Sequence, residues 1–191
     1  MLRLGSRIIG APVMGLQTGT RLATVKAPVI DPSNLKILAY EVEGPLLNEN
    51  PSFLRTADIR EVSGIGMIID SSDEFVGLED VVVIKKLYDL KFKLLDMPVI
   101  DKGNQKLGKV DDYSLDLISF FIEQLSVRRS MIKSLGDTGL LIHRSQIIEI
   151  NNKHIVVQQA KGKLATLQKP SQLSYLNPFR PPNPQADGGD S

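Results

Sequence analysis

The chain has 191 residues, of which 42% are apolar and 24% are charged, a composition typical of a globular protein that folds in water. Lys and Arg number 23 against 22 Asp and Glu, so the formal net charge of +1 creates no long-range attraction to nucleic acid or to an anionic membrane. Cysteine is absent, which excludes disulfides, thiolate nucleophiles and cysteine-ligated metal centres.

The first 16 residues carry Arg3 and Arg7 before an apolar stretch, the pattern that opens a signal peptide. Gly10, Pro12 and Gly15 interrupt this stretch, and no small-residue cleavage motif follows it. We therefore interpret the segment as a first β-strand. No other stretch approaches the ~20 apolar residues that cross a bilayer. We expect a cytoplasmic protein without a membrane span.

The two halves of the chain share one order of strand and turn signals, which indicates an internal repeat. The longest match places residues 54–62 on residues 142–150 without a gap, and the register continues from 67–69 to 155–157. Each half offers about five short β-rich segments separated by Gly, Asn, Asp or Pro, a spacing that favours a small barrel or sandwich. The other matched segments are 11–13 with 97–99, 19–25 with 104–110, 29–31 with 114–116, and 36–40 with 121–125.

These matches divide the chain into module 1 (residues 1–76), a connector (77–90), module 2 (91–161) and a Pro/Gly-rich tail (162–191) that we expect to be flexible. We predict a mainly β fold with two tandem small β-barrels that fold separately. The connector spaces its apolar residues as in an amphipathic helix, but the run of residues 81–84 equally suits a strand. Both alternatives stay open.

Short stretches of both halves resemble the PRC-barrel domain, the small β-barrel of the photosynthetic reaction centre H subunit and of the C-terminal half of the ribosome maturation factor. In the second half these stretches are residues 97–101, 105–113 and 121–127, and in the first half they are 11–13, 18–20, 29–31 and 35–40. The first half departs from the family pattern at Ala23, where Gly is usual. The resemblance implies a module that docks onto proteins, ribosomal proteins included, and shares no catalytic residue.

The only two histidines, His143 and His154, lie on neighbouring predicted strands, where a two-histidine metal or acid–base site is conceivable. In the repeat alignment His143 falls on Arg55 and His154 falls on Gly66, a turn position. We therefore interpret both histidines as surface residues. The sequence predicts no catalytic residue, no metal site and no cofactor.

Three acidic residues, Asp111, Asp112 and Asp116, could in principle hold Mg²⁺ or Ca²⁺, but they lack the spacing of a calcium-binding loop. We interpret them as turn residues, whose side chains hydrogen-bond nearby backbone groups. Residues 64–66 carry a glycine pair before a strand, whereas a phosphate-binding loop follows a strand and precedes a helix. We interpret this segment as a turn.

Two segments remain as candidate partner-binding residues. Arg128, Arg129 and Lys133, flanked by apolar side chains, form the densest basic cluster, and acidic residues occupy the matching connection of the first half. A plain solvated loop is the alternative. Tyr175 and Phe179 interrupt the polar tail and could form a short docking motif; a tail without a role is the alternative.

Together these observations predict a non-enzymatic adaptor or scaffold whose modules bind a protein partner. The alternative function is an accessory factor in ribosome assembly or RNA processing, which would reach RNA or the ribosome through a protein. A nuclease-treated pull-down distinguishes the two. The sequence does not identify the partner or the oligomeric state.

Overall fold

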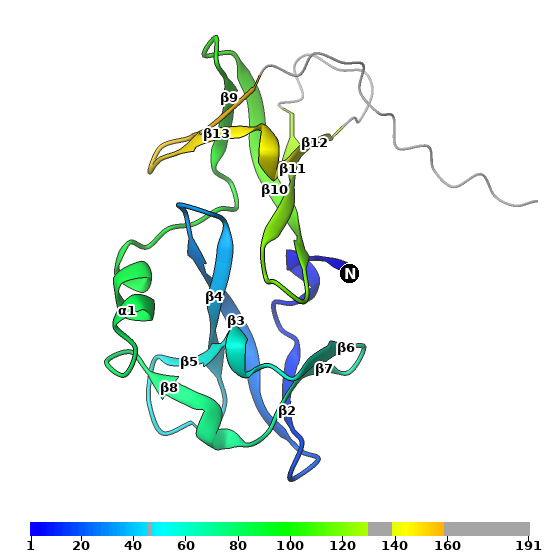
Figure 1. Ribbon diagram of the computed structural model, residues 1–191, viewed down its shortest axis with the longest axis vertical. Helices are drawn as coiled ribbons and strands as arrows, with labels where there is room; N and C mark the ends of the chain where they lie inside the picture. The colour runs from blue at the N-terminus through cyan, green and yellow to red at the C-terminus, as the bar shows by residue number, and fades with distance from the viewer. Residues whose placement is uncertain (46, 130–138, 159–191) are drawn as a thin grey trace, which may run out of the picture.

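The computed structural model describes residues 1–45, 47–129 and 139–158. Over these residues the chain is mainly β, with two mixed seven-stranded sheets and one short α-helix. The two sheets lie end to end along the long axis of the molecule, with the first half of the chain below and the second above (Figure 1). The predicted fold class is confirmed at this level.

The first sheet has the order β6-β7-β2-β3-β4-β5-β8, and the second has the order β12-β11-β10-β9-β14-β13 with β1 beside β10. The strands of the first sheet are β2 (Pro12–Gly15), β3 (Arg21–Asp31), β4 (Lys36–Glu43), β5 (Ser52–Arg55), β6 (Glu61–Ser63), β7 (Gly66–Ile69) and β8 (Phe75–Gly77). Those of the second are β1 (Leu2–Leu4), β9 (Pro98–Asp101), β10 (Lys106–Asp116), β11 (Ile122–Arg128), β12 (Leu140–His143), β13 (Ile147–Ile150) and β14 (Ile155–Val157). The helical elements are α1 (Val82–Asp89) and the 3-10 turns η1 (Gly5–Arg7), η2 (Thr56–Asp58), η3 (Ser72–Glu74) and η5 (Arg144–Gln146).

Strand pairing repeats between the halves residue by residue. Val13 pairs in parallel with Met67, and Val99 pairs in parallel with Ile155. The antiparallel pairs follow the same alignment: Pro12 faces Thr24 as Pro98 faces Lys109, and Ala39 faces Arg55 as Gln124 faces His143. Each half also places a 3-10 turn, η2 or η5, between corresponding strands. The repeat that the sequence indicates is therefore a repeat of sheet topology.

The sheets differ from closed barrels in their hydrogen bonding. Among the described residues, no pairing joins β6 to β8 or β12 to β13, so neither sheet closes on itself through hydrogen bonds. The larger of two buried apolar clusters among the described residues draws from both sheets, including Ile37 and Leu54 from the first and Leu115 and Ile122 from the second. The two halves thus share a core instead of burying two separate ones.

The connector forms a helix, which decides between the two alternatives. Ile84 of α1 is buried with Val29, Ala39 and Phe53 on one face of the first sheet, and the Tyr88 ring lies 5.1 Å from the Phe53 ring. The helix therefore covers an apolar patch that β3, β4 and β5 would otherwise expose. Lys86 and Asp89 are exposed on the helix, and so are Val82 and Val83.

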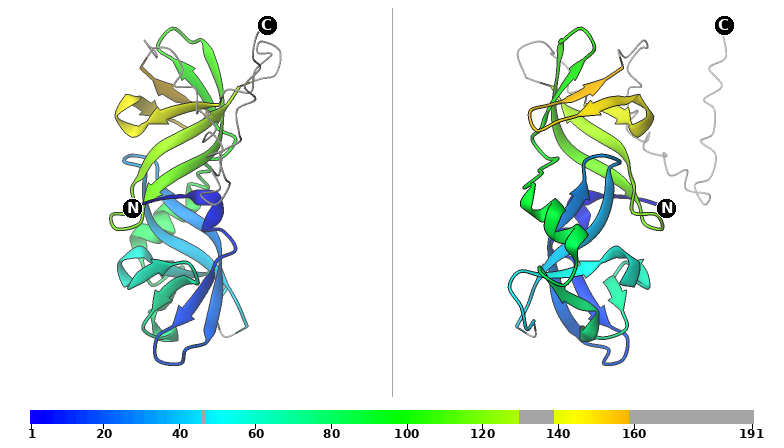
Figure 2. Two further views of the ribbon diagram at one scale, coloured as in Figure 1. Left: turned by 90° about the vertical axis from the view of Figure 1, so that its right-hand side faces the viewer. Right: turned by 60° about the vertical axis from the view of Figure 1, so that its left-hand side comes forward.

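The start of the chain crosses to the second sheet. The strand expected over residues 1–16 forms as two strands, β1 and β2, joined by η1 and a turn at Gly10. Leu2 pairs with Asp116 and Leu4 pairs with Ser114, so β1 lies antiparallel beside β10, whereas β2 belongs to the first sheet. The amino terminus accordingly lies at the level where the two sheets meet (Figure 2).

Candidate functional site

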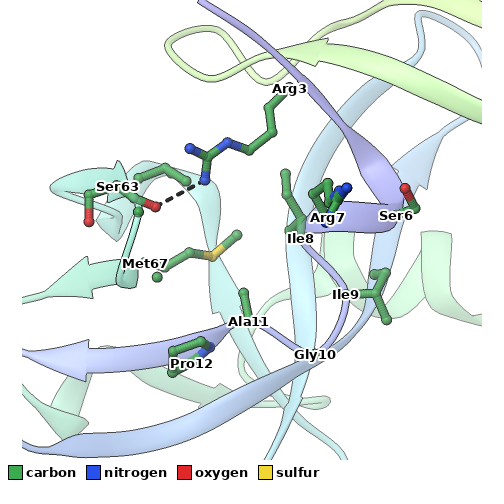
Figure 3. Close-up of a pocket in the computed structure, with 13 residues that line it drawn as sticks. Arg3, Ser6, Arg7, Ile8, Ile9, Gly10, Ala11, Pro12, Ser63 and Met67 are labelled. Atoms are coloured by element: carbon green, nitrogen blue, oxygen red, sulfur yellow. Dashed lines mark hydrogen bonds between the residues drawn. The ribbon is translucent and has the colours of Figure 1, made fainter.

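A hollow of about 350 Å³ opens between the N-terminal segment and the β6–β7 hairpin (Figure 3). Its volume lies at the lower end of the ~300–1,000 Å³ typical of small-ligand pockets. We call this cavity the arginine hollow. Its lining combines two arginines with apolar side chains and backbone. The lining residues are Arg3, Ser6, Arg7, Ile8, Ile9, Gly10, Ala11, Pro12, Val62, Ser63, Gly64, Gly66 and Met67.

Two glycines shape this hollow. Gly10 has a φ of 80°, a conformation that favours glycine, and its N–H donates to the Val25 carbonyl at 2.8 Å as the chain turns into β2. Gly66 has a φ of 132°, and a Cβ there would lie 2.1 Å from the Pro12 carbonyl oxygen. Only glycine allows β7 to approach Pro12 this closely, and both residues line the hollow.

The N-terminal wall of the hollow is anchored on the second sheet. The Ser6 hydroxyl donates to Asp112 Oδ2 at 2.6 Å, and the Ser6 N–H donates to Asp112 Oδ1 at 3.1 Å. Gly5 lies against the Tyr113 ring so closely that an added Cβ would overlap the ring atoms. The opposite wall, β6–β7, belongs to the first sheet. The hollow therefore exists only when the two halves are packed together.

The charged side chains that line the arginine hollow are all positive. Arg3 Nη1 donates to the Ser63 carbonyl at 2.9 Å and so spans the hollow, while Arg7 is exposed beside it. No Asp or Glu is among the lining residues. Ile8 and Met67 are buried and form an apolar floor. The arrangement can accept an anionic group at the arginines together with an apolar group below them.

In the sequence, Arg3 and Arg7 stand out only as the two cations of a signal-peptide-like pattern. No local pattern marks them as neighbours of the β6–β7 hairpin, because some sixty residues separate Arg3 from Ser63. The signal that could have placed them is the alternation of Leu2, Arg3 and Leu4, which is typical of an edge strand with a polar side chain between apolar ones.

The basic cluster predicted from sequence is only partly described. Arg128 ends β11, where its guanidinium lies 3.0 Å from Asp111 and 3.8 Å from Asp96, and Arg129 is exposed next to it. The carboxylates nearest to Arg128 thus come from its own half of the chain. Lys133, Tyr175 and Phe179 lie outside the described residues.

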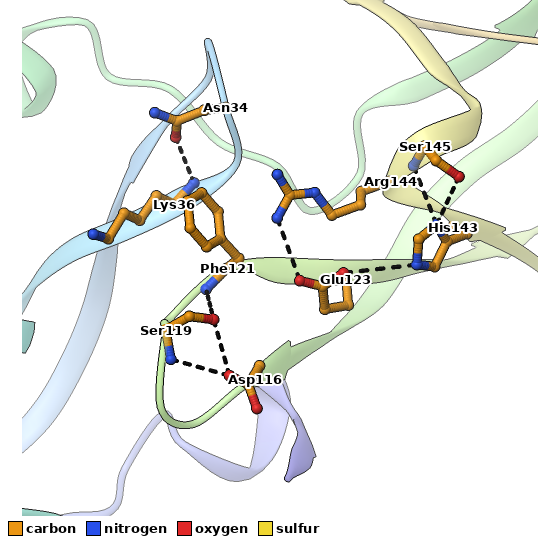
Figure 4. A network of polar contacts seen from close by, with 9 residues as sticks. All are labelled: Asn34, Lys36, Asp116, Ser119, Phe121, Glu123, His143, Arg144 and Ser145. Atoms are coloured by element: carbon orange, nitrogen blue, oxygen red, sulfur yellow. Dashed lines mark hydrogen bonds and ion pairs between the residues drawn. The ribbon is translucent and has the colours of Figure 1, made fainter.

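A polar network joins β11 to η5 near the junction of the sheets (Figure 4). Glu123 lies 3.3 Å from the Arg144 guanidinium and 3.6 Å from His143 Nε2, and Arg144 stacks 4.4 Å from the centre of the Phe121 ring. His143 Nδ1 contacts the Ser145 hydroxyl at 2.8 Å, at the start of η5.

The second histidine has other partners. His154 contacts Asn151 in the β13–β14 turn at 3.3 Å, and among the described residues it shares no hydrogen-bond partner with His143. Over residues 1–45, 47–129 and 139–158, no group of three or more His, Asp or Glu side chains is arranged to hold a metal ion.

The three aspartates have structural partners. Asp111 pairs with Arg128, Asp112 accepts hydrogen bonds from Ser6, and Asp116 accepts from the N–H and the hydroxyl of Ser119 at 3.0 and 2.9 Å. The interpretation as a turn residue is confirmed for Asp116 and is wrong for Asp111 and Asp112, which lie within β10. Gly64 and Ile65 form the turn between β6 and β7, as predicted for this segment, and Gly66 is the first residue of β7.

The sequence was compared with protein families and with curated proteins. No family model matches this sequence, and no curated protein matches it. Within the described part of the chain, no helix has both the length and the apolar character that crossing a bilayer requires.

Proposed function

We propose that the chain is a non-enzymatic, protein-binding adaptor built from two PRC-barrel-like modules, and that a protein partner docks at the arginine hollow. One observation carries this proposal: Arg3 and Arg7 stand over an apolar floor in a hollow without a lining carboxylate. Such a site has a positive potential at its mouth and an apolar interior. A partner that supplies an acidic side chain next to an apolar one complements both.

The surroundings of the hollow support a protein partner over a small molecule. Leu2 and Leu4 flank Arg3 on β1 and are 52% and 41% exposed, Ile9 is 40% exposed, and Ile65 at the tip of the β6–β7 hairpin is 65% exposed. A small molecule inside the hollow would leave these side chains in water. A polypeptide laid across the hollow would cover them, as apolar residues are covered at the centre of protein interfaces.

A pair of defined peptides tests the partner chemistry. We expect a fluorescent peptide of alternating Glu and Leu to bind the full chain roughly tenfold more tightly than a peptide of alternating Lys and Leu, by fluorescence anisotropy at 50 mM salt. The difference should shrink at 300 mM salt, because exposed charges are screened. Equal affinities for the two peptides would overturn the proposal.

Matched variants locate the binding site. Arg3→Ser with Arg7→Ser should abolish the preference for the acidic peptide, and Arg3→Lys with Arg7→Lys should keep most of it because the charge remains. Arg128→Ser with Arg129→Ser removes the same charge elsewhere and should bind like the wild type. If this control loses the preference and the Arg3/Arg7 variant keeps it, the basic cluster at Arg128 is the docking surface instead.

A pull-down from native cells, with and without nuclease, tests the alternative in ribosome assembly or RNA processing. An adaptor for proteins should retain its partners after nuclease treatment. Loss of every partner with nuclease would favour the RNA-linked function.

A further inference from the structure

The tips of the two long hairpins insert corresponding residues into the core that both sheets share. Leu35 lies between β3 and β4, and its counterpart Phe120 lies between β10 and β11; both are buried, with left-handed backbones at φ 60° and 56°. The Ile37 N–H donates to the Phe120 carbonyl, and the Ile122 N–H donates to the Leu35 carbonyl. Each tip therefore gives and receives the same contacts, as two subunits do across a two-fold interface.

The residues at the centre of this junction select unlike halves. Lys36 faces Phe121 in an antiparallel bridge, and Lys36 Nζ lies 5.5 Å from the centre of the Phe121 ring. Two first halves joined in the same way would place Lys36 opposite Lys36, and like charges at directly opposite positions destabilise a pair of strands. The junction thus fits a first half against a second half, whichever chain supplies the second half.

The covalent link between the halves passes through a short exposed segment after α1, at Leu90 and Lys91. Lys91 has a φ of 50°, a left-handed conformation that residues other than glycine disfavour, and its N–H donates to the Tyr88 carbonyl at 3.0 Å. An extended backbone at Lys91 relieves this strain and directs the second half away from its own first half. Because Leu90 and Lys91 are exposed, the change breaks no buried contact of the link itself.

We propose that two copies of this chain exchange halves about Lys91, so that the first half of each chain packs on the second half of the other. Every contact of the junction then forms twice, and the two exchanged junctions close the assembly as a dimer instead of extending it into a filament. All residues that line the arginine hollow lie in the first half, so the dimer holds two hollows. The exchange does not depend on what the hollow binds.

The tether and the strain at Lys91 act in opposite directions on this equilibrium. The link holds the two halves of one chain at an effective concentration of roughly millimolar, which favours the closed monomer at lower protein concentrations. Exchange should therefore increase with protein concentration, and it should increase further when Lys91 is replaced by a residue that is less tolerant of a positive φ. It also requires the junction to open, so the test uses chains that refold together.

Because the chain has no cysteine, two single-cysteine variants report exchange directly. One full chain carries Lys36→Cys and the other carries Phe121→Cys; the two are mixed in urea, refolded together at roughly millimolar concentration and oxidised mildly. In an exchanged dimer the two positions face each other across chains, within the ~4.4–6.8 Å Cα separation that a disulfide needs. A closed monomer holds one thiol and forms no disulfide. Non-reducing electrophoresis and mass spectrometry identify the products.

We expect disulfides that join position 36 of one chain to position 121 of the other to outnumber those between like positions by at least about tenfold. A majority of disulfides between like positions would overturn the proposal, because the chains would then meet without exchanging halves. A mixture without disulfide-linked dimers would overturn it as well.

Substitutions at the link provide a second readout, by size-exclusion chromatography with light scattering on chains refolded at one concentration. Lys91→Val should raise the dimer fraction at least about fivefold, because β-branched residues are rarely found at a positive φ. Lys91→Gly should lower it, because glycine adopts this conformation readily. Lys93→Val and Lys93→Gly remove the same charge at a nearby exposed position and should keep the wild-type fraction. Equal dimer fractions for the two Lys91 variants would contradict exchange about Lys91.

Discussion

Lys36 and Phe121 face each other in an antiparallel bridge between the two sheets, and they are counterparts in the internal repeat. The hydrogen bonds beside the bridge are related in the same way: the Ile37 N–H donates to the Phe120 carbonyl and the Ile122 N–H donates to the Leu35 carbonyl, each at 2.9 Å. A contact in which corresponding residues meet is the signature of a two-fold relation. The halves therefore associate as two subunits of a symmetric dimer would.

The cations around Phe121 should stabilise this junction measurably. The Arg144 guanidinium lies 4.4 Å from the centre of the Phe121 ring, and Lys36 Nζ lies 5.5 Å from it. In a double-mutant cycle with Phe121→Leu and Arg144→Ala, we expect a coupling free energy of about 0.5–1 kcal/mol from urea unfolding. Strict additivity of the two changes would show that the stacked arrangement contributes nothing.

Tyr40→Phe should stabilise the protein. The Tyr40 ring is fully buried, 6.4 Å from the Phe120 ring, and its hydroxyl has no hydrogen-bond partner among the residues that the structure describes. An unpaired buried hydroxyl costs free energy, so its removal should raise the free energy of unfolding by about 1 kcal/mol. Tyr88→Phe, at a half-buried position, is the control and should change it little. Destabilisation by Tyr40→Phe would mean that the hydroxyl is satisfied in solution.

Gly5→Ala should destabilise the docking of the N-terminal segment. The added Cβ would overlap the buried Tyr113 ring, which has little room to move, so we expect a loss of about 1–3 kcal/mol in the free energy of unfolding. Gly64→Ala is the matched control, because no atom lies near the added Cβ and the backbone is ordinary. Similar stabilities for the two variants would contradict the close contact between η1 and β10.

Stability should fall in acid partly through Asp116. Hydrogen bonds from the Met1 amino group and from Ser119 hold the pKa of Asp116 well below its ordinary value. Because the folded state lowers this pKa, the contribution is fully present above the unfolded pKa of ~3.9 and is lost as pH decreases toward the lowered value. Urea unfolding between pH 5 and pH 2.5 should therefore show a weaker decline for Asp116→Asn than for the wild type. Identical pH profiles would argue against these hydrogen bonds.

The succession of strands and turns along the chain could be predicted from sequence because local signals recur at matched positions. Pro12 and Pro98 mark the start of corresponding strands, and Asp31 and Asp116 end the long ones. Each signal acts through neighbouring residues: a proline without a donor, or a carboxylate that caps its own turn. Because the same signals occur at corresponding positions in both halves, the strand assignment in each half supports the assignment in the other.

The arginine hollow and the crossing of β1 could not be predicted in this way. The pairing of Leu2 with Asp116 joins residues at distant points of the chain, and a three-residue strand has too short a pattern to specify its partner. The hollow follows from that crossing, because Arg3 reaches Ser63 only once β1 lies on β10. Long-range packing therefore decides the part of the molecule on which the proposed function rests.

The pairing of β1 with β10 also constrains the order in which the parts of the protein can fold. Residues 2–4 leave the ribosome long before residues 114–116, the segment of β10 with which they pair. Strands β2 to β8 need no residue beyond 77 for their pairings, so the first sheet can assemble while its own N-terminal extension still waits. Residues 2–4 are thus synthesised long before the partner strand that holds them in their native place.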